Sequence, residues 1–203
     1  YIFASETCAL DIVGASFVRE VRNGEIVVIE NKKIESINPF PKQKSRPCVF
    51  EYIYFARPDS LIDGKCAYEY RKNLGKELAI ESELDADIVV PVPDSGVPSA
   101  LGYAQHTKIN FELGLIRNHY VGRTFIEPTQ NIRSLGVKLK LSSTKSIIKN
   151  KKIILIDDSL VRGTTCHKIV KMLYDSGAKE VHVKISCPCL LYTSDAADEE
   201  DSV

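Results

Sequence analysis

Apolar runs alternate with segments of helical periodicity over most of this chain. The apolar runs predict strands at residues 49–55, 88–91, 111–116, 152–156 and 180–185. An apolar stripe, or a proline suited to a first turn, predicts helices at residues 66–81, 98–106 and 166–176. Gly177 would end the last of these helices. Strands that alternate with helices predict an α/β fold, with a parallel sheet flanked by helices.

The first part of the chain has a different pattern, made of short β-like runs. Residues 17–37 predict three short strands, and Asn23-Gly24 is a strong hairpin signal between the first two. Residues 31–33 predict a second, weaker turn. Residues 39–47 are rich in proline and lysine, which predicts a linker and a domain boundary.

The most informative segment is residues 153–165, where a strand runs into acids, hydroxyls and a glycine. Four apolar residues precede Asp157 and Asp158, and the following loop leads onto a predicted helix. Hydroxyl donors, and a glycine that lets the backbone come close, are supplied by Ser159, Gly163, Thr164 and Thr165. A helix N-terminus favours phosphate, and paired acids can bind ribose hydroxyls or hydrated Mg²⁺. The pattern therefore favours a sugar-phosphate site over a solvated turn before a capped helix.

Two loops are placed where ligands of parallel sheets bind. Residues 93–97 and 157–165 each follow a predicted strand, so both lie at the carboxyl edge of the sheet. Residues 118–140 are long, polar and weakly periodic, which is typical of a functional lid.

Composition narrows the functional classes. The chain has 203 residues, 44% hydrophobic and 27% charged, and its 27 basic and 27 acidic residues balance. No nucleic-acid partner and no membrane partner is therefore expected, and no transmembrane run or signal peptide is recognised. The six cysteines are scattered without a CxxC pair, which favours a reducing cytoplasm. Because residue 1 is Tyr, the sequence is expected to be a fragment.

Residues 153–165 resemble the phosphoribosyl pyrophosphate (PRPP) signature of type I phosphoribosyltransferases. Further segments narrow the resemblance to the glutamine PRPP amidotransferases, or amidophosphoribosyltransferases: residues 50–60, 91–96, 112–126 and 131–141. Residues 5–11 resemble the end of that family's N-terminal glutaminase domain. The resemblance implies a type I phosphoribosyltransferase fold at 48–188, after a linker at 39–47 and a short β remnant of an Ntn glutaminase domain at 1–38.

The resemblance also implies a reaction. PRPP loses pyrophosphate while ammonia, supplied from glutamine in the full enzyme, attacks the ribose to give 5-phosphoribosylamine, the first committed step of purine synthesis. The leaving group must be neutralised and the sugar held in place, and Mg²⁺ is the expected cofactor. Full-length relatives are expected to be homo-oligomers that purine nucleotides inhibit.

The resemblance implies a role for each residue of this chain that matches a position in the family's motifs. The catalytic residues would be Arg123, Asp157 and Asp158, and the magnesium site would contain Ser95, Asp157 and Asp158. The substrate-binding residues would be Asp94, Ser95, Gly96, Lys138, Ser159, Arg162, Gly163, Thr164 and Thr165. Asp94 to Gly96 would form the pyrophosphate loop, and residues 159–165 would hold the 5′-phosphate. A lid at residues 120–141 would cover the phosphates with Arg123, Arg133, Lys138 and Lys140.

The chain departs from the family's cysteine pattern. The full enzyme has a nucleophilic cysteine at its mature N-terminus, where this chain has Tyr1, and Cys8 lies at the domain's end. Glutamine hydrolysis is therefore expected to be missing. Cys48 matches one ligand position of the cluster-bearing branch, so a [4Fe-4S] cluster is a candidate cofactor of the full-length enzyme. A small buried apolar cysteine is the favoured interpretation of Cys48.

Residues 189–203 lose the resemblance abruptly. Their sequence resembles the translation of a transposon-type sequencing adapter, so they are predicted to be a non-native tail; an acidic solvated tail is the alternative. Two functional alternatives also stay open. One is a salvage phosphoribosyltransferase for a purine or pyrimidine base, and the other is a PRPP-binding regulator that does not catalyse.

Overall fold

A computed structural model describes residues 1–41, 44, 46–82, 84–120, 140–160 and 163–187. The chain forms two compact units, Tyr1–Ala67 and Tyr68–Val203. Residues 48–67 thus cluster with the first unit, and the predicted domain boundary at 39–47 stays a prediction.

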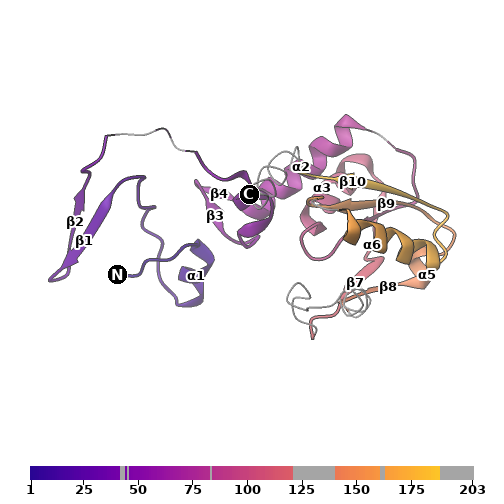
Figure 1. Cartoon of the computed structure of the whole chain (residues 1–203), viewed down its shortest axis with the longest axis horizontal. Helices are drawn as coiled ribbons and strands as arrows, with labels where there is room; N and C mark the ends of the chain where they lie inside the picture. The colour runs from indigo at the N-terminus through magenta and orange to yellow at the C-terminus, as the bar shows by residue number, and fades with distance from the viewer. Residues whose placement is uncertain (42–43, 45, 83, 121–139, 161–162, 188–203) are drawn as a thin grey trace, which may run out of the picture. The chain divides into compact units, whose positions relative to one another are not determined.

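The second unit is built on a parallel sheet of strand order β10-β9-β5-β6, of which Figure 1 labels β9 and β10. Its strands are β5 (Ile88–Pro91), β6 (Asn110–Phe111), β9 (Lys152–Asp157) and β10 (Glu180–Ile185). Each neighbouring pair is parallel. All four residues of β5 are buried, as expected for a strand covered on both faces. The predicted α/β fold with a parallel sheet flanked by helices is confirmed.

Alternate residues of the central strands point to opposite faces of the sheet and pack into two separate hydrophobic cores. Val89 and Ile154 pack on one face with Tyr103, whereas Val90 and Leu155 pack on the other face. The first core is closed by α2 (Ala67–Glu81) and α3 (Val97–Thr107), and the second by α5 (Lys145–Ile148) and α6 (Thr164–Asp175) (Figure 1). Each fully buried large apolar side chain stabilises the fold by about 1.5–3 kcal/mol.

Two glycines set the distance between α2 and α3. A Cβ atom on Gly75 would lie 1.8 Å from the Ser99 carbonyl oxygen, and one on Gly102 would lie 1.9 Å from the Lys72 carbonyl oxygen. The two helix backbones therefore touch, and no side chain fits at either position. This contact fixes α3, which begins directly after the loop at Asp94–Gly96.

Between α3 and β9, the chain also forms a two-stranded antiparallel ribbon that is separate from the main sheet. It pairs β7 (Leu115–Arg117) with β8 (Leu141–Ser143), and the Asn118 amide donates to the Lys140 carbonyl at 2.7 Å. The strand predicted at 111–116 is therefore two strands, β6 and β7. Gly114 separates them, since its amide turns back to the Glu112 carbonyl at 2.9 Å.

The first unit contains α1 (Thr7–Ile12) and two small hairpins. One hairpin pairs β1 (Ile26–Glu30) with β2 (Lys33–Ile37), and the other pairs β3 (Leu61–Ile62) with β4 (Lys65–Cys66). The hairpin predicted around Asn23-Gly24 is wrong, because residues 17–22 form no strand. A turn exists there, but Arg19 and Glu25 hold its two sides by an ion pair of 2.7 Å. The turn predicted as weaker closes the real hairpin, at Asn31 and Lys32 with φ of 49° and 63°.

The strand predicted at residues 49–55 is also wrong. These residues form a helical segment that includes a π-helix, Glu51–Phe55, in which the Ala56 amide donates to the Glu51 carbonyl at 3.2 Å. The rings of Phe50 and Phe55 come together across this turn, with centroids 5.5 Å apart. This helical turn gives the backbone a local hydrogen bond. It also brings together the rings of Phe50 and Phe55, which would point to opposite faces of a β-strand.

Candidate functional site

Two loops meet at the carboxyl edge of the sheet, where the sequence predicted a ligand site. One loop joins β5 to α3 and the other joins β9 to α6, and Pro91 on β5 is paired with Ile156 on β9. The Ser95 hydroxyl donates to Asp158 Oδ1 at 2.8 Å. Two motifs that are 63 positions apart in the chain are therefore in direct contact.

Asp158 is the most firmly held side chain of this site. Asp158 is 5% exposed, and each of its carboxylate oxygens accepts a hydrogen bond from a serine hydroxyl. Oδ1 takes the Ser95 hydroxyl, and Oδ2 takes the Ser159 hydroxyl at 3.0 Å. Both donors were predicted site residues, so the structure brings Ser95, Asp158 and Ser159 together.

Asp157 has an unusual proton affinity. Burial, followed by a side-chain hydrogen bond and charge repulsion from Asp158, raises the pKa of Asp157 to about 8. The Asp158 amide, which donates to Asp157 Oδ1 at 2.9 Å, opposes this shift. Asp157 thus keeps a proton near neutral pH, and a divalent cation between the acids would reverse that balance.

The first loop is shaped by a close backbone approach. A Cβ atom on Gly96 would lie 2.5 Å from the Ile156 carbonyl oxygen, so only glycine fits against β9. Asp94 points its carboxylate to Arg117, whose Nη1 lies 2.6 Å from Oδ2. Arg117 was not among the site residues predicted from the sequence. Its position just before the predicted lid was the available signal.

The second loop ends at an uncapped helix N-terminus. Gly163, with φ of 67°, is the N-cap of α6, and among the residues that the structure describes no side chain caps this helix. Thr164 and Thr165 follow at the surface in the first turn. The first-turn N–H groups of α6 and the two threonine hydroxyls therefore lie at the helix N-terminus that follows β9 in the chain, an arrangement that suits an anion.

Other predicted site residues lie outside the described residues: Arg123, Arg133, Lys138 and Arg162. The tail at 189–203 lies outside them as well. Their predicted roles stay predictions.

The cysteines give no cluster in the described part of the chain. Cys48 is exposed, so its interpretation as a small buried cysteine is wrong. Burial and the nearby Asp157 raise the pKa of the Cys166 thiol, which makes it a poor thiolate nucleophile. Among the described residues, no three His, Cys, Asp or Glu side chains are grouped as a metal site.

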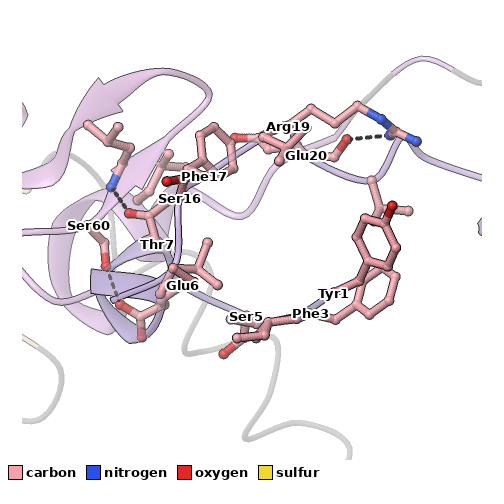
Figure 2. Close-up of a pocket in the computed structure, with 18 of the residues that line it drawn as sticks. Tyr1, Phe3, Ser5, Glu6, Thr7, Ser16, Phe17, Arg19, Glu20 and Ser60 are labelled. Carbon is pink, nitrogen blue, oxygen red and sulfur yellow. Dashed lines mark hydrogen bonds between the residues drawn. The ribbon is translucent and has the colours of Figure 1, made fainter. Parts of the chain in front are cut away.

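The first unit holds a cavity of about 740 Å³ with a largely apolar wall, whose aromatic lining includes Tyr1, Phe3 and Phe17 (Figure 2). Among the acids that line this cavity, Glu6 has a shifted pKa. The Arg57 amide and the Ser60 hydroxyl each donate to Glu6 Oε2 at 2.8 Å and lower the pKa of this carboxyl. These bonds tie the start of α1 to residues 57–60, so Glu6 has a structural role.

Comparison with known proteins shows which family this chain belongs to. The phosphoribosyl transferase domain matches residues 69–202. The chain belongs to this family. Over 196 residues it is 56% identical to the amidophosphoribosyltransferase of Rhizobium etli, covering 94% of the chain and 40% of that relative. Over 206 residues it is 48% identical to the chloroplastic amidophosphoribosyltransferase of Vigna aconitifolia, covering 100% of the chain and 42% of that relative.

A solved structure supports the same placement. The glutamine PRPP amidotransferase from Bacillus subtilis, complexed with ADP and GMP, superimposes with a TM-score of 0.83 at 48% identity. The match covers 97% of this chain and 46% of that one. The type I phosphoribosyltransferase fold is therefore confirmed, and the chain spans less than half the length of the relatives it matches.

Two predictions are not decided by these matches. The family match reaches residue 202 and so includes most of the predicted adapter-derived tail, which stays a prediction. Among the described residues, no helix is both long and apolar enough to cross a membrane. The cytoplasmic location stays a prediction.

Proposed function

We propose that the chain carries the PRPP-binding and ribosyl-transfer half of an amidophosphoribosyltransferase. In this reaction the bond from ribose C1 to pyrophosphate breaks, and ammonia forms the new bond at C1. The observation that carries the proposal is the Ser95–Asp158 hydrogen bond of 2.8 Å, which joins the two loops expected to hold the two ends of PRPP.

Different residues of the site would bind different parts of PRPP. Asp157 and Asp158 at the end of β9 would accept the ribose hydroxyls. The loop at Asp94–Gly96 would hold the pyrophosphate, and the segment from Ser159 to Thr165, with the first turn of α6, would hold the 5′-phosphate. Arg123 and Lys138 would cover the leaving group and neutralise its charge.

Mg²⁺ fits the donors that the structure supplies. Ser95, Asp157 and Asp158 offer hard oxygen atoms, and a bound cation would offset the charge repulsion that Asp158 exerts on Asp157. In proteins Mg²⁺ is commonly bound by one or two carboxylates together with substrate phosphates. When bound, it would offset the negative charge that develops on the leaving pyrophosphate.

An iron–sulfur cluster has less support from the described residues. Cys48 is exposed and stands outside any described metal-binding group, so we propose no step that uses such a cluster. The Bacillus subtilis relative was solved with ADP and GMP, which supports purine nucleotides as ligands of the full enzyme. Ammonia from glutamine and a homo-oligomeric assembly complete the proposal for the full-length protein.

The test is a titration of the 203-residue chain with PRPP by calorimetry, with and without MgCl₂, after circular dichroism shows that the sample is folded. We expect Mg²⁺-dependent binding that weakens in Asp157→Asn and Asp158→Asn. A folded wild-type chain without PRPP affinity would contradict the proposal.

Turnover separates the proposed reaction from its alternatives. Pyrophosphate release from PRPP should require ammonium. Release that instead requires a purine or pyrimidine base would indicate a salvage enzyme. Binding without turnover under either condition would indicate a PRPP-binding regulator.

A further inference from the structure

Two buried serines, Ser99 and Ser186, form a hydrogen-bonded pair next to the backbone of Asp157. Ser99 in the first turn of α3 is 1% exposed, and Ser186, which follows β10, is 7% exposed. Their hydroxyl oxygens are 3.0 Å apart, and the Ser99 hydroxyl donates to the Arg71 carbonyl at 3.0 Å. The Ser99 hydroxyl therefore has two acceptors within hydrogen-bond distance, the Arg71 carbonyl and the Ser186 hydroxyl, and its single proton serves one of them at a time. Contacts of this one hydroxyl therefore link the end of β10 through α3 to α2.

The same end of β10 holds the aspartates by their backbone. Regular pairing of β9 and β10 ends at Asp157 and Ile185. Beyond it, the Ser186 amide donates to the Asp157 carbonyl and the Cys187 amide to the Asp158 carbonyl, both at 3.0 Å. Ser186 thus contacts Asp157 through its amide and Ser99 through its hydroxyl.

The start of α3 therefore reaches the acid pair by two routes. Ser95, just before α3, binds the Asp158 side chain directly. Ser99, one turn later, acts through Ser186 on the Asp157 backbone. The close contact of Ser99 with Gly75 of α2 keeps this turn from moving.

We propose that Ser99 and Ser186 are positioning residues that fix the two aspartates relative to the pyrophosphate loop. Neither hydroxyl is expected to touch the ligand, since each is buried and already hydrogen-bonded within the protein. The inference rests on the proposed function, because its readout is Mg²⁺-dependent PRPP binding. Loss of partners that orient metal-binding side chains typically weakens metal affinity by about 10–100-fold.

The chain contains a matched control. Ser176 is 8% exposed, donates to the Met172 carbonyl at 2.7 Å, and lies 2.6 Å from the Ser143 hydroxyl. This second pair has the same chemistry as the first. It lies at the other end of β9, since neighbouring Gly177 accepts the amide of Asn150, just before that strand begins.

The experiment compares PRPP affinity, at a fixed MgCl₂ concentration below saturation, with thermal stability in the full chain. We expect Ser99→Ala and Ser186→Ala each to weaken PRPP binding about tenfold. The double variant should be weakened less than the product of the two single effects, because both act in one chain of hydrogen bonds. Ser176→Ala should lower the melting temperature and leave PRPP affinity unchanged.

Unchanged affinity in folded Ser99→Ala and Ser186→Ala would overturn the inference, and so would an equal loss in Ser176→Ala. If Ser99→Ala does not fold, the comparison of Ser186→Ala with Ser176→Ala decides. A folded wild-type chain without PRPP affinity would instead reject the proposed function.

Discussion

Arg117 at the end of β7 holds Asp94 in the first site loop, with Nη1 2.6 Å from Oδ2. This ion pair connects the ribbon from which the predicted lid departs to the loop expected to bind pyrophosphate. Both side chains are partly exposed, at 40% and 55%, so the pair should contribute only about 0–1 kcal/mol to stability. Its importance would lie in keeping a cation beside the pyrophosphate loop.

Arg117→Gln should therefore weaken PRPP binding about tenfold, an effect of roughly 1.4 kcal/mol, while the free energy of unfolding changes by less than about 1 kcal/mol. Arg117→Lys keeps the charge and is the control, with most of the affinity retained. Calorimetric titration and urea unfolding measure the two quantities. Equal affinity in the wild type and Arg117→Gln would show that this cation does not face the ligand.

Asp157 should make stability depend on pH in the absence of Mg²⁺. Its pKa is about 8 in the folded chain, against an ordinary value of 3.8, so the folded state keeps a proton that the unfolded state has lost. The stabilisation from this proton is full below about pH 4 and is lost as pH rises through about 8. The free energy of unfolding should fall by up to about 1 kcal/mol per pH unit in this window.

Asp157→Asn is the matched variant, since it keeps the shape and removes the titration. Thermal unfolding in EDTA at pH 5, 6.5 and 8 should show a steeper decline for the wild type than for Asp157→Asn. Parallel declines would mean that Asp157 titrates normally. Added MgCl₂ should flatten the wild-type decline, because the cation favours the ionised carboxylate.

The contact between α2 and α3 should not tolerate a methyl group. Gly102→Ala places a Cβ 1.9 Å from the Lys72 carbonyl oxygen, and backbone atoms must shift to relieve the clash. We expect a loss of about 1–3 kcal/mol or more, read from the urea midpoint. Asn73→Ala, at an exposed position of α2, should change stability by less than about 0.5 kcal/mol. A neutral Gly102→Ala would disprove the close backbone contact.

The predicted tail should be dispensable. Deleting residues 189–203 should leave the melting temperature and PRPP affinity unchanged, because five of the seven residues from 195 to 201 are acidic and favour a solvated segment. The untruncated chain measured in parallel is the reference. A clear drop in either quantity, or a genomic clone that encodes the same tail, would contradict the adapter origin.

The sequence by itself determined the elements whose signals are local. β9 and α6 follow from an apolar run and an apolar stripe, and Asp157, Asp158 and Gly163 follow from their place between the two. Parallel pairing follows as well, because strands joined through helices return in the same direction. Local signals misled at Asn23-Gly24, where the turn forms but an Arg19–Glu25 ion pair replaces strand pairing.

Only the tertiary structure decided which side chains meet. The bonds from Ser95 to Asp158, from Arg117 to Asp94 and from Ser99 to Ser186 join residues that are distant in the chain. No periodicity encodes these contacts, since they depend on strand order and on the glycine contact that sets α3 against α2. The raised pKa of Asp157 has the same origin, because burial, its largest cause, exists only after the two loops and the helices have packed around β9.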